Sequence, residues 1–359
     1  MRIIQMLTTV SYGDAVSNDA IAINDTLKKY GYSTGLYAEN IDPRLPKKLA
    51  TKIEAVPKLE KEDVILYHLS TGTDLNYKLS EYKGRKVIIY HNVTPNHFFK
   101  NYNENTRRLC AEGEKGLKYL AEYADYGLAV SEYNRQGMIE AGYTCKVDVL
   151  PILIPFDDYK KTPNKKVMQK YFGTEYTNIL FTGRLAPNKK QDDVIRAFYM
   201  YKKYYNPKAR LFIVGSYSGM EKYYRRLKEY VKELQLKDVF FTGHIKFDEI
   251  LAYYHIADYF LCMSEHEGFC VPLVEAMLFQ VPIIAYDSSA IGETLGGSGF
   301  LLKDKNPLQT AGVLDYLDRH PKVREQMIQD QMRRLQDFDH DHIEKQFVEY
   351  LEKFVEENK

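Results

Sequence analysis

Cysteine is scarce in this chain, and no two cysteines have the short spacing of a metal-binding motif. The four are scattered, at Cys110, Cys145, Cys262 and Cys270. This pattern argues against both a disulfide framework and a structural zinc site. We therefore expect the protein to work in the reducing cytoplasm.

Long apolar runs are also absent. The first residues, MRIIQMLTTVSYGD, contain one basic residue and an apolar stretch broken by polar side chains, so a secretory leader is not expected. No later segment approaches the ~18 consecutive apolar residues of a membrane span. We expect a soluble protein, and peripheral contact with the inner face of the membrane is the alternative.

The chain has no excess of positive charge. Lysine and arginine number 50, against 49 aspartates and glutamates, so nothing would draw the whole chain onto nucleic acid. Gly215 and Gly219 follow a predicted strand but lack the G-x-G-x-x-G spacing of a dinucleotide-binding turn. No Walker A sequence and no G-x-S-x-G elbow occurs either. Any anionic ligand must be held by a local group of residues.

The pattern that is present is an alternation of short apolar runs with longer segments of helical period, which is typical of parallel sheets with crossover helices. The length of 359 residues favours two domains. Strands are predicted at 3–7, 33–38, 64–67, 86–90, 126–130 and 146–150, and then at 178–181, 209–214, 239–242, 259–263 and 281–285. The predicted fold class is α/β, with one doubly wound, Rossmann-like unit in each half.

A polar stretch with flanking prolines, PFDDYKKTPNKK, marks the predicted domain junction, because it cannot easily continue a helix. We assign residues 1–155 to an N-terminal domain and residues 156–340 to a C-terminal domain, facing each other across a cleft. Residues 341–359 are predicted as an amphipathic helix that packs back onto the N-terminal domain. Its apolar stripe consists of Ile343, Phe347, Leu351 and Phe354.

Glycines, cations and a carboxylate follow three predicted strands of the second half. Ligands of open parallel sheets bind at the carboxyl ends of strands, so these loops are the candidate site. The loops contain Gly183, Arg184 and Lys189, then His244 and Ile245, and then Glu267, Gly268, Phe269, Cys270 and Val271.

A diphosphate ester fits this set of residues. Arg184 and Lys189 can neutralise its charge, and a helix that begins near Pro272 adds a positive dipole end and free amides. Gly268 permits close approach of the ligand to the backbone. We therefore expect no metal and no cofactor beyond the donor substrate.

Glu267 and Glu275 stand eight positions apart, in the loop and in the following helix. A carboxylate accepts hydrogen bonds from vicinal hydroxyls, so one could hold a sugar and the other a ribose. Two glutamates alone would more often be solvated surface charges. The strand end, the Gly-Phe that follows and the helix start favour the functional interpretation.

The segments SEHEGFCVPLVEAM and FTGRLAPNKKQDDVIRAF resemble the E-x7-E motif and the G-R-L…K segment of family 4 retaining glycosyltransferases, which have the GT-B fold. The resemblance implies that Arg184 and Lys189 bind the donor diphosphate and that the backbone around Ile245 binds the base. It implies further that Glu267, with the amides of Phe269 and Cys270, binds the sugar, and that Glu275 binds the ribose. Many members of the family have glycine at the position of Cys270.

The first half contributes three weaker candidate sites. Gly13 and Asp14 loosely match the family's glycine loop, without its doubled glycine, and an ordinary strand-to-helix turn is the alternative. His68 and His91 each follow a predicted strand. The family's histidines in such loops meet the sugar or the acceptor, whereas a histidine at a strand end is otherwise a structural hydrogen-bonding group.

The leading hypothesis is transfer of a hexosyl group from a UDP- or GDP-sugar with retention of configuration. A sugar phosphorylase, a nucleotide-sugar epimerase and a catalytically silent partner subunit on the same fold are the alternatives. The segment YHNVTPNHFF resembles proteins of bacterial surface-polysaccharide assembly, which implies a glycan or lipid-linked acceptor. The helix that follows could rest on anionic lipid or be solvated. Its basic residues are Lys100, Arg107, Arg108, Lys115 and Lys118.

Overall fold

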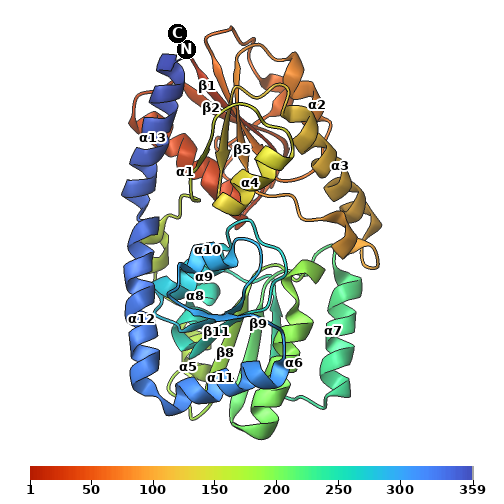
Figure 1. Ribbon diagram of the computed structural model, residues 1–359, viewed down its shortest axis with the longest axis vertical. Coiled ribbons are helices and arrows are strands. Elements are labelled where there is room, and N and C mark those ends of the chain that lie inside the picture. Colours follow the sequence, from red (N-terminus) through yellow and green to blue (C-terminus); the bar gives the residue numbers. More distant parts are fainter. Residues whose placement is uncertain (358–359) are drawn as a thin grey trace. The chain divides into compact units, whose positions relative to one another are not determined.

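A computed structural model describes residues 1–357, which form two compact α/β units (Figure 1). The first unit contains Met1–His97, Asn105–Phe156 and the chain from Phe338 onward, and the second contains Phe98–Glu104 and Asp157–Asp337. Each unit is built on one parallel sheet.

The first unit has a seven-stranded sheet with the order β3-β2-β1-β4-β5-β6-β7. Its strands are β1 (Ile3–Val10), β2 (Thr34–Ile41), β3 (Thr51–Lys52), β4 (Val64–Leu69), β5 (Arg85–Tyr90), β6 (Tyr126–Ala129) and β7 (Val147–Val149). Its helices are α1 (Ala15–Lys29), α2 (Leu75–Lys78), α3 (Glu104–Leu120), α4 (Glu132–Glu140) and α13 (His340–Glu357). The strand order reverses between β1 and β4, so their carboxyl ends are a natural ligand position.

The second unit has a six-stranded sheet with the order β10-β9-β8-β11-β12-β13. Its strands are β8 (Thr177–Thr182), β9 (Ala209–Val214), β10 (Val239–Gly243), β11 (Tyr259–Cys262), β12 (Ile283–Tyr286) and β13 (Phe300–Leu302). Its helices are α5 (Lys165–Tyr171), α6 (Gln191–Tyr204), α7 (Glu221–Glu233), α8 (Phe247–Ile256), α9 (Val271–Leu278), α10 (Ile291–Leu295), α11 (Pro307–Arg319) and α12 (Pro321–Leu335). Here the order reverses between β8 and β11, whose following loops contain the predicted cations and Glu267.

All eleven predicted strands are present, with ends that differ by three residues or fewer. The two unpredicted strands, β3 and β13, have two and three residues, which is too short for a periodic signal. Within the described residues, no helix combines the length and the apolarity needed to cross a membrane.

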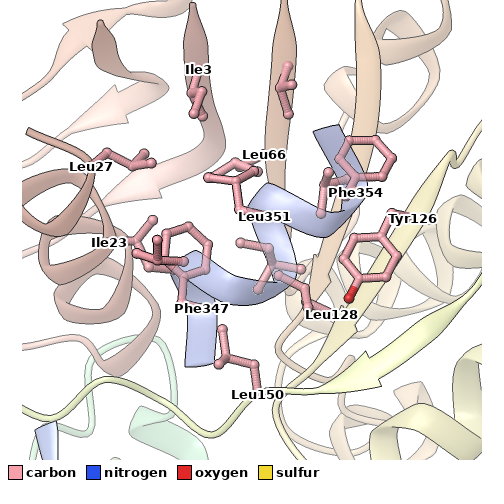
Figure 2. Close-up of a cluster of buried hydrophobic side chains, with 14 of the residues drawn as sticks. Ile3, Ile23, Leu27, Leu66, Tyr126, Leu128, Leu150, Phe347, Leu351 and Phe354 are labelled. Atoms are coloured by element: carbon pink, nitrogen blue, oxygen red, sulfur yellow. The ribbon is translucent and has the colours of Figure 1, made fainter. Parts of the chain in front are cut away.

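Helix α13 forms part of the core of the first unit. Phe347, Leu351 and Phe354 belong to one buried cluster with side chains of the central strands. Figure 2 shows Leu351 beside Leu66 and Phe354 beside Tyr126. The helix begins one residue earlier than predicted, at His340. Residues 358 and 359, the end of the predicted helix, lie outside the described part of the chain.

This packing predicts that Phe347→Ala will destabilise the protein. Phe347 is fully buried, and removal of a buried phenyl ring costs about 3–5 kcal/mol. The matched control is Phe172→Ala, because Phe172 is 63% exposed and should change stability by less than about 0.5 kcal/mol. Urea unfolding followed by circular dichroism measures both, and equal midpoints for the two variants would contradict the assignment of α13 to this core.

Candidate functional site

The loops after β8 and β9 are packed tightly together, and this contact positions Arg184. A Cβ atom at Gly215 would lie 1.9 Å from the carbonyl oxygen of Gly183, so only glycine fits at Gly215. The amide of Leu185 donates to the carbonyl of Ser216 at 2.9 Å. The Arg184 side chain is exposed and donates from Nη2 to the carbonyl of Ser218 at 3.2 Å.

Lys189 and Glu267 form an ion pair between the loops that follow the adjacent strands β8 and β11. The side chain of Glu267 is only 7% exposed and that of Lys189 is 25% exposed. Burial alone would lower the pKa of Lys189, but the attraction of Glu267 outweighs it and the pKa is raised. Lys189 therefore stays a cation and neutralises a nearly buried carboxylate.

Hydrogen bonds to the backbone hold the loop around Glu267. The amide of Glu267 donates to Ser289 Oγ at 2.8 Å, and Asn188 Nδ2 donates to the carbonyl of His266 at 3.1 Å. Thr294 Oγ1 donates to the carbonyl of Phe269 at 2.5 Å. These bonds hold the conformation of the loop without a ligand. Gly268 is half-buried near the end of the loop.

Cys270 occupies the residue before α9 with a φ of 75°, in the left-handed region. Glycine adopts this conformation at no steric cost, whereas a side chain is strained there. This φ explains why a glycine suits the position. Val271 begins α9, and Pro272 lies in its first turn as predicted.

Glu275, in α9, accepts a hydrogen bond at each carboxylate oxygen. Tyr159 donates at 2.7 Å and Tyr254 at 2.6 Å. The Tyr254 hydroxyl also lies 2.6 Å from Thr182 Oγ1, at the end of β8. Burial raises the pKa of Glu275, although the two hydroxyls oppose this shift.

His244 and Ile245 follow β10, which is the edge strand of the sheet. His244 is exposed and Ile245 is half-buried. They lie two strands away from β8 in the order of the sheet, and their role in binding the base stays a prediction.

In the first unit, Gly13 and Asp14 form the turn from β1 to α1. Gly13 has a φ of 73°. Asp14 caps the helix, because its carboxylate accepts from the amide of Ser17 at 3.0 Å and from its hydroxyl at 2.8 Å. This geometry is that of a strand-to-helix turn, and a ligand-binding role for the two residues stays a prediction.

His68 and His91 lie in one buried row with Gln5 and Asp19. His68 Nε2 lies 2.9 Å from Gln5 Oε1, and His68 Nδ1 lies 2.9 Å from His91 Nε2. Because the amide oxygen only accepts, His68 is protonated on Nε2 and accepts from His91 Nε2. Burial holds the pKa of His68 well below its ordinary value and lowers that of His91 to about 3, so both rings are neutral.

Asp19 completes this row. Its Oδ2 lies 3.7 Å from His91 Nε2, and its Oδ1 accepts from the amide of Leu153 at 2.8 Å. Burial raises the pKa of Asp19 to about 7.

Among residues 1–357, two groups of side chains have the donor atoms for a metal ion. Asp19, His68 and His91 form one group, and Cys262, Glu267 and Cys270 form the other, with donor atoms within 4.8 Å of one another in each. The hydrogen bonds of His68 to His91 and Gln5, and that of Asp19 to the amide of Leu153, account for the arrangement of the first group without an ion.

Sequence reasoning missed Tyr159, Tyr254 and Gln5, all of which contact predicted site residues. Tyrosine is frequent throughout the chain, with 31 residues, so its presence near the site gives no local signal. The signal for Gln5 was its polarity: it is the polar residue inside an otherwise apolar strand segment, Ile3–Leu7.

The raised pKa of Asp19 predicts how Asp19→Asn will change the dependence of stability on pH. The folded state holds a proton that the unfolded state releases near pH 4, so the contribution of Asp19 to the stability of the wild type falls as the pH rises from about 4 to about 7. Between pH 4.5 and pH 7.5 the variant should gain about 3 kcal/mol of stability relative to the wild type. Urea unfolding at pH 4.5 and 7.5 measures the difference in the free energy of unfolding between the variant and the wild type. Both proteins contain His68 and His91, so the contributions of these residues largely cancel in that difference. A difference that does not change with pH would contradict the shift.

Comparison with known proteins finds a family model that matches most of the second unit. Residues 164–334 match the family model described as "Glycosyl transferases group 1". The chain is 31% identical over 138 residues to mannosylfructose-phosphate synthase of Agrobacterium fabrum, an alignment that covers 36% of this chain and 30% of that protein. It is 27% identical over 190 residues to a GDP-mannose-dependent alpha-(1-6)-phosphatidylinositol monomannoside mannosyltransferase of Mycobacterium tuberculosis, which covers 50% and 48%. The chain thus spans less than half the length of these two relatives.

A solved structure matches both units. The Anabaena protein HepE, in complex with UDP-glucose, has a TM-score of 0.77 and 19% identity, over 98% of this chain and all of that one. This likeness establishes the fold. Residues 164–334 therefore resemble the group 1 glycosyl transferases, in a chain whose two parallel-sheet units have the GT-B fold.

Proposed function

We propose that this protein transfers a hexosyl group from a UDP- or GDP-sugar to a glycan or lipid-linked acceptor, with retention of configuration and without a metal ion. The observation that carries the proposal is the Lys189–Glu267 ion pair beside the start of α9, inside the segment that matches the family model. A cation for a diphosphate and a carboxylate for sugar hydroxyls stand there side by side.

The donor diphosphate would lie between Arg184, Lys189 and the start of α9. Arg184 is exposed, so its guanidinium is free to turn toward a ligand from its single carbonyl partner. Negative charge grows on the diphosphate as the glycosidic bond breaks, and cations placed beforehand stabilise it without a metal. Because Lys189 now pairs with Glu267, binding of the donor would exchange one anionic partner of Lys189 for another.

The two glutamates have surroundings that suit different hydroxyls. Glu275 is held rigidly by Tyr159 and Tyr254, and each carboxylate oxygen keeps a second lone pair for a ribose hydroxyl. Glu267 would turn from Lys189 toward the hydroxyls of the transferred sugar. Names of relatives and neighbours support both nucleotides, since one relative depends on GDP-mannose and one neighbour was solved with UDP-glucose.

The assignment of Glu275 predicts that Glu275→Gln will weaken binding of the free nucleotide. A hydrogen bond to a charged group is worth about 1.5–3 kcal/mol, so the dissociation constant of UDP or GDP should rise by about ten- to a hundredfold. Glu267→Gln should instead weaken the sugar nucleotide more than the free nucleotide. Calorimetric titration of both ligands into both variants measures this, and an unchanged nucleotide affinity for Glu275→Gln would remove that residue from the ribose.

The metal-free clamp predicts that transfer survives EDTA and that the double change Arg184→Ala, Lys189→Ala nearly abolishes it. The matched control is Arg319→Ala, Lys303→Ala, which removes the same charges from exposed positions and should leave activity unchanged. Release of nucleotide that depends on an acceptor gives the rate, and proton NMR of the new linkage gives its anomer. Activity that EDTA stops and Mg²⁺ or Mn²⁺ restores would contradict the clamp, and an inverted anomer would contradict retention.

A further inference from the structure

Two of the scattered cysteines meet beside Glu267. Cys262 ends β11 and Cys270 precedes α9, and the loop between them returns so that their sulfur atoms and a carboxylate oxygen of Glu267 lie within 4.8 Å of one another. Cys262 is 1% exposed, Glu267 is 7% exposed and Cys270 is 8% exposed. The three side chains are therefore all buried where they converge.

The chemistry of this group is that of a site for a thiophilic divalent ion. Thiolates with one carboxylate suit Zn²⁺ and Cd²⁺ and suit Mg²⁺ or Mn²⁺ poorly. The thiols of Cys262 and Cys270 contact each other, which lowers the pKa of Cys262 and raises that of Cys270. Metal binding would release both thiol protons to solvent, because thiolates are the ligands.

Lys189 is the cation that now holds Glu267. Its ammonium and a bound dication would repel each other, so the two compete for one carboxylate. Lys189 has the room to leave, since its side chain is 25% exposed whereas that of Glu267 is 7% exposed. A soft dication can replace it because two thiolates add ligand bonds that the ammonium does not form.

We propose that Cys262, Glu267 and Cys270 form an inhibitory site for Zn²⁺ or a similar thiophilic ion, with a water molecule in the fourth position. Occupation of the site removes Glu267 from Lys189 and from the donor sugar, so the ion inhibits glycosyl transfer. The inhibition rests on the proposed function, but the binding of the ion does not.

Titration with Cd²⁺ tests the binding directly, because thiolate coordination to Cd²⁺ absorbs in the ultraviolet and needs no enzyme assay. The full chain is kept reduced with a phosphine that has little affinity for the ion. We expect one equivalent to bind with a thiolate signal, and Cys262→Ser or Cys270→Ser to weaken binding by about tenfold or more. The controls are Cys110→Ser and Cys145→Ser, which remove thiols outside the group and should leave the signal and affinity unchanged.

Lys189→Met tests the competition, since methionine keeps the shape of the side chain and removes its charge. Cd²⁺ should bind this variant more tightly than the wild type, and weaker binding would contradict the competition. Equal signals from all four serine variants, or no thiolate signal in the wild type, would overturn the site.

Zn²⁺ should then inhibit transfer in the wild type and in the two control variants, with recovery on addition of EDTA. It should inhibit Cys262→Ser much less. A protein that binds Cd²⁺ as described but transfers no sugar from any donor would refute the proposed function and leave the metal site intact. Inhibition by Zn²⁺ that persists unchanged in Cys262→Ser and Cys270→Ser would refute the inhibitory role.

Discussion

The ion pair between Lys189 and Glu267 is the interaction on which the candidate site depends. It joins the loops after β8 and β11, the two strands at which the strand order of the second sheet reverses. Loss of one partner of a buried ion pair costs about 3–5 kcal/mol, because the other charge is left without compensation. The pair therefore compensates the charge of Glu267, which is nearly buried, and a ligand that brings its own charges and hydroxyls can replace the partner of each residue.

The loops after β8 and β11 can bind either the donor of the proposed reaction or the proposed inhibitory ion. A sugar diphosphate supplies anions to Lys189 and hydroxyls to Glu267, so both charges stay paired when it binds. A thiophilic ion supplies only positive charge, and it reaches Glu267 by displacing Lys189. Cys270 takes part in both binding events. It has a left-handed backbone conformation before α9. Its backbone lies in the proposed diphosphate site, and its thiol lies beside Cys262.

The sequence predicted the elements of this site because the parallel-sheet pattern is local. Strands β8 and β11 contain the apolar runs 179–181 and 259–262, and Arg184, Lys189 and Glu267 follow them in the sequence within about seven residues. Contacts between distant segments have no such pattern. Tyr159 and Glu275 are 116 positions apart, and the eight-residue spacing of Cys262 and Cys270 has no metal signature until the turn between β11 and α9 is known. The row of Gln5, His68 and His91 likewise depends on how β1, β4 and β5 align with one another. The apolar pattern of the sequence predicts the strands but not this alignment.

The central claim is that a nucleotide sugar binds to the second unit at the loops after β8 and β11. Hydrogen–deuterium exchange with and without a saturating UDP- or GDP-sugar tests it most directly, since bound ligand protects the amides it covers. The account predicts slower exchange at residues 182–190 and 264–275 with at least one such donor, and no protection there in Arg184→Ala, Lys189→Ala. Unchanged exchange in both segments with every UDP- and GDP-sugar, or protection confined to other parts of the chain, would contradict it.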